Sequence, residues 1–233
     1  MSDYKIANIT TGKQLKRAID FVFEVFGPEE IDVRPEQYYQ RWIGRMELYK
    51  DLFFYAELDG KIIAVAFAWQ QHEQISVGPI ATAANFRRRG LARKMMLLQE
   101  KAAAARGIRT LALEAALGTE AFYEKMGYTA IVDIDSKFHS LEQLHSLNTK
   151  YELKDIFEAD ESRPFLKELE KLIKTETDEE TLELYKKLLS SMKSNHIQLI
   201  MPVADRDLVE QYKKTFPGCT AYMYFEKKLP ELT

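Results

Sequence analysis

The sequence predicts an α/β protein in which helices flank a mixed, twisted β-sheet. Segments with strand character alternate with segments of helical periodicity over more than half of the chain. Asp59-Gly60 separates two strand-like segments and is typical of a hairpin turn. Of the 233 residues, 46% are hydrophobic, which suffices for a buried core in one large domain or two small ones.

The part of the chain before the hairpin predicts one strand and two helices. Residues 4–10 have strand character, and apolar residues recur at helical spacing over Gln14–Phe26. A second helix is expected over Pro35–Leu48, because proline suits the first turn of a helix. We expect core positions for the aromatic residues of this second helix, Tyr38, Tyr39 and Trp42.

Three strands and a helix follow. Phe53–Leu58 and Lys61–Trp69 are the strands of the predicted hairpin, and Ile75–Thr82 is the third strand. Gly78-Pro79 interrupts this third strand. Because proline cannot donate a ladder hydrogen bond, we expect a bulge or a splayed sheet edge there. A helix is then predicted from Gly90 to Arg106.

The alternating pattern ends with a strand, a short helix and another strand. These are predicted at Thr110–Ala115, Thr119–Met126 and Tyr128–Ile134. Helical periodicity then dominates, with apolar stripes at residues 165–173 and 182–192. The sequence therefore predicts that a mostly helical C-terminal elaboration follows the sheet.

We divide the chain into a core, residues 1–139, and a C-terminal helical region with strands, residues 140–233. We predict that residues 220–228 return to the main sheet, so that residues 140–215 form an inserted, mostly helical cap. The alternative is that Ile197–Met201 makes the tail a separate small α/β unit.

Composition limits the class of protein. The net charge of −3 gives no basic excess, so nucleic acid is not an expected partner. No apolar run approaches the roughly 18 residues of a membrane span, and the N-terminus lacks the pattern of a signal peptide. The single cysteine, Cys219, excludes an internal disulfide, and the histidines show no metal-ligand spacing. We expect a cytoplasmic protein without metal or membrane contact, and a homodimer is one open alternative for its oligomeric state.

A basic turn between a strand and a helix carries the clearest chemical signal. The strand Ile80–Thr82 leads into Arg87–Arg89, and Gly90 then opens the helix. The first amides of a helix lack internal partners and lie at the positive end of its dipole. The turn therefore favours an anion such as a pyrophosphate. The alternative interpretation is a solvated basic turn followed by a packing glycine.

A second stretch follows some thirty residues later, and the two together resemble the GNAT superfamily of N-acetyltransferases. The acetyl-CoA motif of that family, (Arg or Gln)-x-x-Gly-x-(Gly or Ala), is matched by Arg87, Gly90 and Ala92. Its later Phe/Leu-Tyr-Glu-Lys-x-Gly-Phe/Tyr turn is matched by residues Phe122–Tyr128. The resemblance covers about residues 60–135 well.

The resemblance implies an acetyl-CoA-dependent N-acetyltransferase, an acyltransferase that moves acetyl directly to an amine through a tetrahedral intermediate. It implies that the strand pairs with the pantetheine arm, that the turn holds the pyrophosphate, and that a backbone N–H stabilises the oxyanion. The implied acetyl-CoA-binding residues are Ile80, Ala81, Thr82, Arg87, Arg88, Arg89, Gly90, Leu91 and Ala92.

Two catalytic residues follow from the same resemblance. Tyr123 would donate to the leaving thiolate, since a phenol with a pKa of about 10 is protonated at neutral pH. Its alternative is a core aromatic beside Phe122. Glu114 is the candidate base, and its alternative is a salt-bridged or solvent-exposed strand end. The expected acceptor is a small-molecule amine. The alternatives are a protein N-terminus or lysine as acceptor, and a non-catalytic acyl-CoA-binding regulatory module.

Overall fold

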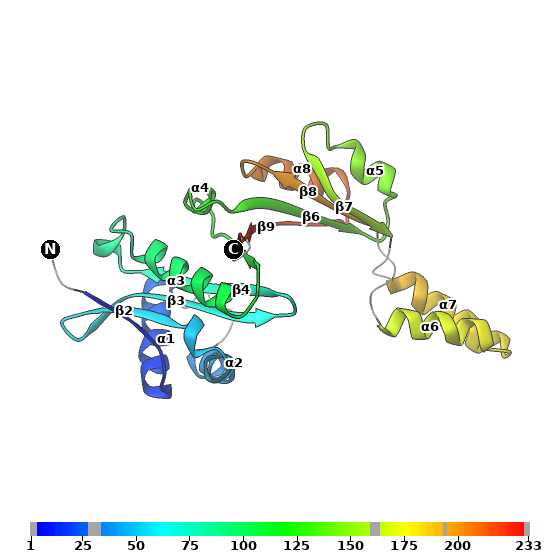
Figure 1. Ribbon diagram of the computed structural model, residues 1–233. Coiled ribbons are helices and arrows are strands. Elements are labelled where there is room, and N and C mark those ends of the chain that lie inside the picture. Colours follow the sequence, from blue (N-terminus) through cyan, green and yellow to red (C-terminus); the bar gives the residue numbers. More distant parts are fainter. Residues whose placement is uncertain (1–3, 28–33, 159–163, 193–194, 231–233) are drawn as a thin grey trace. The chain divides into compact units, whose positions relative to one another are not determined.

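The computed structural model of the chain describes residues 4–27, 34–158, 164–192 and 195–230 (Figure 1). For residues 154–158, 164–167 and 187–192 it describes the backbone alone. The chain divides into two compact units. The first comprises Met1–Glu114 with Glu226–Thr233, and the second comprises Ala115–Phe225. Each unit is described by itself.

The first unit is a sheet with helices on both faces. Its strands and helices are β1 (Lys5–Asn8), α1 (Gly12–Phe26), α2 (Pro35–Leu48), β2 (Phe54–Leu58), β3 (Lys61–Gln71), β4 (Gln74–Thr82), α3 (Leu91–Ala105) and β5 (Thr110–Leu113), with short 3₁₀ turns at Lys50–Leu52 and Ala84–Phe86. Strands β1 to β4 pair antiparallel in chain order, and β5 pairs parallel with β4. Helices α1 and α2 lie on one face and α3 on the other (Figure 1).

The predicted hairpin joins β2 and β3. Leu58 pairs with Lys61, so the turn consists of Asp59 and Gly60 alone. Both have positive φ, 50° and 76°. Positive φ at both central residues is the conformation of a type I′ turn, whose twist matches that of the flanking strands. The prediction from Asp59-Gly60 is confirmed.

Strand β4 carries the predicted bulge. Ala66 of β3 pairs with Ile80 and Ala68 pairs with Val77, so β4 has one residue more than β3 at Gly78-Pro79. On its other side, β4 pairs with β5 only over Gln74–Ser76. The edge of β4 that faces β5 is therefore unpaired from the bulge onward.

Apolar side chains fill both faces of this sheet. On the α3 face, residues from β2, β3 and α3 form a cluster of Phe54, Ala56, Ile63, Ala64, Ala66, Leu91 and Met95. On the α2 face, Trp42 contacts the rings of Phe53 and Phe67. Tyr38 and Trp42 are buried, as predicted, and Tyr39 is half-buried.

Lys227 and Leu229, near the C-terminus, are held within the first unit. The ammonium of Lys227 lies 2.8 Å from both carboxylate oxygens of Glu100 on α3, and both side chains are largely buried. The backbone N–H of Leu229 donates to the carbonyl of Arg109 at 2.7 Å. Because an unpaired buried charge is costly, these contacts tie the C-terminal segment to α3 and β5.

The second unit is also α/β. Its elements are α4 (Glu120–Lys125), β6 (Thr129–Ser136), α5 (Leu141–Ser146), β7 (Glu152–Glu158), α6 (Pro164–Thr175), α7 (Glu179–Met192), β8 (Asn195–Met201), α8 (Arg206–Thr215) and β9 (Thr220–Lys228), of which the last three residues belong to the first unit. Strand β8 pairs antiparallel with β6 and β7. Helices α6 and α7 pack against each other.

Strand β7 was not predicted from the sequence. Leu153 pairs with Leu199 and Ile156 with Ile197, and the register shifts between Leu153 and Asp155. The irregularity places the two apolar residues three positions apart instead of two. Strict alternation, the sequence signal of a half-buried strand, is therefore missing.

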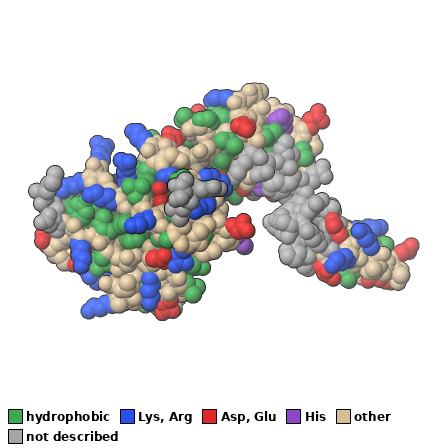
Figure 2. All heavy atoms as spheres, in the orientation of Figure 1, with side chains coloured by type: hydrophobic (Ala, Val, Ile, Leu, Met, Phe, Trp, Pro, Cys, Tyr) green, Lys and Arg blue, Asp and Glu red, His purple; other side chains and the backbone are tan. Residues whose placement is uncertain are grey.

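The described strands follow the order β1-β2-β3-β4-β5-β9-β6-β8-β7 in a mixed sheet. The predicted fold class, a mixed sheet flanked by helices with a helical C-terminal part, is confirmed. The division at residue 139 and the cap formed by residues 140–215 stay predictions. Within the described ranges, no helix combines the length and apolar character that a bilayer crossing requires. Acidic and basic side chains are interspersed on the face shown in Figure 2.

Candidate functional site

The open edge of β4 presents free backbone groups. The N–H of Ala83 donates to the carbonyl of Ile63 at 2.9 Å, which fixes the alternation of the β3–β4 ladder. Residues 81 and 83 direct their N–H and C=O groups toward β3, so Ile80 and Thr82 direct theirs away from it. This is the side that β5 leaves unpaired. The edge can thus bind an extended ligand through hydrogen bonds to the main chain.

The edge leads into a turn with further unpaired donors. Arg87–Gly90 are exposed, and Arg88 and Gly90 have φ values of 61° and 77°. The hydrogen-bond ladder of α3 begins at Lys94, whose N–H donates to the Gly90 carbonyl at 3.0 Å. The N–H groups of residues 88–93 donate to no acceptor in the described part of the chain. Unpaired amides at the start of a fifteen-residue helix can bind an anion.

Backbone conformation accounts for the glycine at position 90. A β-carbon there would meet nothing within 4 Å, so space alone does not select glycine. The left-handed φ of 77° does, because β-carbons disfavour it. Next to it, the guanidinium of Arg89 lies 4.9 Å from the Phe86 ring centre, and Arg87 Nε donates to the Thr82 carbonyl at 3.2 Å.

A second close approach occurs at the bulge. A β-carbon on Gly78 would lie 2.6 Å from Cη2 of Trp42 and 3.0 Å from Cζ3 of Trp69. The two indole rings therefore pack directly on the main chain of β4, with ring centres 5.3 Å apart. Sequence reasoning singled out Trp42 but missed Trp69, which lies on β3.

Glu114 follows the last residue of β5. Gln74 pairs with Thr110 and Ser76 with Ala112, so the same register places Glu114 across the opening from Gly78. The residue is exposed and has no hydrogen bond or ion pair with other residues that the structure describes. A carboxylate at this position can accept a proton from a group bound in the opening.

Tyr123 lies on α4 in the second unit. Its ring contacts those of Phe122, Tyr128 and Phe225, and 8% of the residue is exposed. Burial raises the pKa of Tyr123 to about 12. Its hydroxyl has no hydrogen-bond partner among the residues with described side chains. The arrangement combines the predicted core aromatic with a free, protonated donor.

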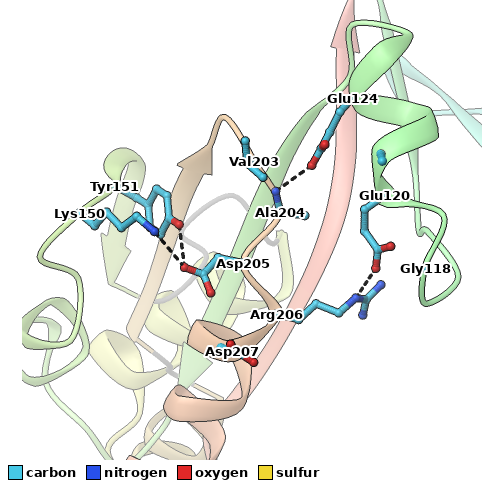
Figure 3. Close-up of a pocket in the computed structure, with 11 residues that line it drawn as sticks. Gly118, Glu120, Glu124, Lys150, Tyr151, Val203, Ala204, Asp205, Arg206 and Asp207 are labelled. Carbon is cyan, nitrogen blue, oxygen red and sulfur yellow. Dashed lines mark hydrogen bonds and ion pairs between the residues drawn. The ribbon is translucent and has the colours of Figure 1, made fainter.

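The second unit also contains an open groove of about 560 Å³ (Figure 3). Its lining residues come from α4 and the loop before it, from the loop before β7, and from the β8–α8 connection. Glu120 pairs with Arg206, and Glu124 accepts the N–H of Ala204 at 2.9 Å. These contacts join α4 to the start of α8.

Asp205 caps α8 on the other side of the groove. One oxygen of its carboxylate accepts the N–H of Leu208 at 3.1 Å, and the other accepts the hydroxyl of Tyr151 at 2.7 Å (Figure 3). Lys150 lies 3.4 Å from the same carboxylate. The hydrogen bond from Tyr151 is the main cause that lowers the pKa of Asp205. Since these groups satisfy one another, their role in the groove is to hold the loops together.

Comparison with known proteins gives one family. Residues 19–128 match the model of the acetyltransferase (GNAT) family. A search among curated proteins gave no match. Among the residues that the structure describes, no group of three or more His, Cys, Asp or Glu side chains is arranged to hold a metal ion.

Solved structures resemble the chain at low identity. A protein from Pyrococcus horikoshii, named as a putative acetyltransferase, is 14% identical and has a TM-score of 0.52, over 99% of this chain and 91% of that one. The ribosomal-protein-S18-alanine N-acetyltransferase from Escherichia coli is 15% identical, with a TM-score of 0.45, over 87% and 96% of the two chains. The PaiA N-acetyltransferase from Thermoplasma acidophilum, in complex with coenzyme A, is 17% identical, with a TM-score of 0.43, over 54% and 89%.

The Pyrococcus structure shows that the fold is shared, and the family match lies on the segment with the open strand edge and the turn of free amides. Residues 19–128 of the chain therefore form a domain of the GNAT family of acetyltransferases.

Proposed function

We propose that this protein binds acetyl-CoA and transfers the acetyl group to an amine. The observation that carries the proposal is the continuity of two sets of free donors. The unpaired edge at Ile80 and Thr82 leads directly into the amides of residues 88–93, which donate to no acceptor in the described part of the chain. A pantetheine amide chain suits the edge, and a pyrophosphate suits the turn.

Both the backbone and the side chains of the turn would bind the pyrophosphate. The amides of residues 88–92 would bind the pyrophosphate, and exposed Arg87, Arg88 and Arg89 would add positive charge around it. Ala81 lies between Ile80 and Thr82, whose N–H groups point away from β3, and keeps its own backbone groups in the ladder with β3. Its burial fixes the edge that Ile80 and Thr82 present.

The bulge is where the acyl group would lie. An arm that extends along the open edge from the turn reaches Gly78-Pro79 shortly before β5 closes the edge at Ser76. A backbone N–H near the bulge can stabilise the negative oxygen that forms when an amine attacks the thioester carbonyl. Glu114, across the opening, is our proposed base for the proton that the amine must lose.

Tyr123 is our proposed donor to the leaving thiolate. With a pKa of about 12, its phenol is a weaker acid than an ordinary thiol, whose pKa is about 8.5. Full transfer of the proton to sulfur is therefore uphill. A hydrogen bond in which the proton stays on the tyrosine oxygen stabilises the thiolate without that cost.

Binding of acetyl-CoA tests the first half of the proposal. Gly90→Glu adds a negative side chain at the turn, and we expect it to abolish the binding measured by calorimetry and the thermal stabilisation by acetyl-CoA. Gly107→Glu is the matched control. Gly107 has φ 75°, close to the 77° of Gly90, has open space around it, and follows the other end of α3. Unchanged affinity in folded Gly90→Glu, or equal loss in both variants, would contradict the assignment.

Release of free thiol from acetyl-CoA tests the second half. With a panel of amines, an acetyltransferase releases thiol in proportion to acetylated product, whereas a module that only binds acyl-CoA releases none. Peptides with free N-termini and lysine side chains belong in the panel. If they were acetylated far better than small amines, the acceptor would be a protein.

A further inference from the structure

Arg45 of α2 lies over two aromatic rings at the edge of the first unit's sheet. Its guanidinium carbon is 5.0 Å from the ring centre of Trp42 and 4.1 Å from that of Trp69. Contacts of this kind attract a cation and limit the orientations that its planar group can adopt. The residue is half-buried.

The charge of Arg45 is not compensated within the described part of the protein. No carboxylate pairs with it there, whereas Arg17, Arg106 and Arg206 each pair with an acidic side chain. Arg41, one turn earlier on α2, is exposed and also lacks an acidic partner in that part of the chain. Like charges four residues apart repel each other. The charge of Arg45, which no described carboxylate neutralises, favours the binding of an anion at this position.

The pKa of Arg45 is consistent with a cation held in this environment. Burial, and then the charge of Arg41, lower its pKa from the ordinary value of an arginine. Arginine nevertheless remains charged in proteins at neutral pH. The site therefore offers a permanent positive charge with a fixed donor geometry.

Arg45 lies close to the bulge of β4. Trp69 pairs with Ser76 of β4, and both indoles pack on Gly78. The Trp69 ring is thus close to both the guanidinium and the main chain at the bulge. If the proposed function holds, the thioester lies at this bulge, and the acceptor amine must approach the thioester close to Arg45.

We propose that Arg45 binds an anionic group of the acceptor, so that the substrate is an amine that also carries a carboxylate. This inference rests on the proposed function and specifies its acceptor. A guanidinium binds a carboxylate through two parallel hydrogen bonds, and the indole faces hold its plane in place for that contact. The carboxylate anchors the acceptor while its amine reaches the thioester, and Glu114 is placed on the other side of the opening.

The test compares amines that differ only in charge. Glycine, β-alanine and 4-aminobutyrate are each assayed against their amides, with thiol release from acetyl-CoA as the readout. The series also varies the distance between amine and carboxylate. O-Phosphoethanolamine against ethanolamine distinguishes a phosphate from a carboxylate as the anion. We expect kcat/KM to favour at least one carboxylate over its amide by roughly 10- to 100-fold, the range for hydrogen bonds to a charged group.

Variants of α2 identify the residue responsible. Arg45→Met should reduce the preference for the carboxylate to about one, with kcat/KM for the amides within about threefold of the native value, and Arg45→Lys should retain part of the preference. Arg41→Met is the control on the same helix and should keep most of the preference. Acetyl-CoA affinity, measured by calorimetry, should be native in all three variants.

Four results would overturn the inference. Native protein that acetylates every amide as well as its acid lacks the proposed specificity. An Arg45→Met variant that loses activity equally toward acids and amides shows that Arg45 only supports the fold. A preference for the phosphate alone assigns a different anion. Protein that binds acetyl-CoA but releases no thiol with any amine contradicts the proposed function itself, and this inference with it.

Discussion

The close packing at Gly78 predicts a specific effect of the smallest possible substitution. Gly78→Ala adds one methyl group, which would lie 2.6 Å from Cη2 of Trp42 and 3.0 Å from Cζ3 of Trp69. Both distances are shorter than normal contacts between carbon atoms, which are about 3.5–4.0 Å. Neither atom is the end of a flexible chain. The rings, or the strand, must therefore move.

The cost follows from the nature of the contact. Insertion of a methyl group into a packed core typically costs about 1–3 kcal/mol. Gly44→Ala provides the opposite case, since Gly44 lies within α2 and has nothing within 4 Å of the added β-carbon. An alanine in a helix is about 1 kcal/mol more favourable than a glycine. We therefore expect Gly78→Ala to lower the free energy of unfolding and Gly44→Ala to raise it.

Intrinsic fluorescence measures the effect at the site. The chain has two tryptophans, Trp42 and Trp69, and both contact Gly78. Denaturant unfolding followed by tryptophan emission should show a lower midpoint for Gly78→Ala and a higher one for Gly44→Ala. The emission of folded Gly78→Ala should also differ from that of the native protein, because the rings have moved.

A stable Gly78→Ala variant with native emission would refute this reasoning. It would mean that the strand accommodates a side chain without displacing the indoles. The packing of α2 on the bulge would then not be the tight contact described above. Acetyl-CoA affinity of the same variant offers a further check, since a displaced bulge should weaken it.

Three further predictions concern single side chains. Tyr123→Phe should lower kcat roughly 10- to 100-fold, the effect expected from loss of a hydrogen bond to a charged group, and acetyl-CoA affinity should stay near native. Native turnover in this variant would mean that Tyr123 serves packing alone. Asp205→Ala should lower the free energy of unfolding by about 1 kcal/mol at pH 7, because α8 loses its N-terminal cap. The hydrogen bond from Tyr151 lowers the pKa of Asp205 in the folded protein. The ionised carboxylate therefore stabilises the fold above the unfolded pKa of about 3.9, and this stabilisation is lost as the pH falls through the lower folded pKa. The stabilities of native protein and variant should converge in acid unfolding. Lys227→Met should destabilise the first unit by about 3 kcal/mol, since Glu100 loses its buried partner; denaturation unaffected by the change would place this pair in solvent.

Local signals in the sequence predicted local structure well. Asp59-Gly60 specifies its turn because both residues tolerate positive φ, and Gly78-Pro79 specifies the bulge because proline cannot donate. The helix that opens at Gly90 follows from the same kind of signal. Each depends on neighbours in the chain, so a single sequence is sufficient to read it.

The anion site at Arg45 illustrates what the sequence does not contain. Arg45, Trp69 and Gly78 come from α2, β3 and β4, and nothing in their spacing indicates that they meet. Strand β7 was missed for a different reason, because its register shift removes the alternation of apolar and polar residues from the sequence. Glu114 and Tyr123 were identified by resemblance to a family, and their catalytic roles stay proposals.

The one-sided pairing of β4 has a consequence for isotope exchange. Consecutive residues of this strand differ in the protection of their amides, because Ala81 and Ala83 donate to β3 while Ile80 and Thr82 donate to no strand. In free protein, deuterium should therefore replace the amide hydrogens in an alternating fast and slow pattern along the strand. A ligand that lies along the edge should slow the fast pair selectively, and so reveal its direction and length one residue at a time.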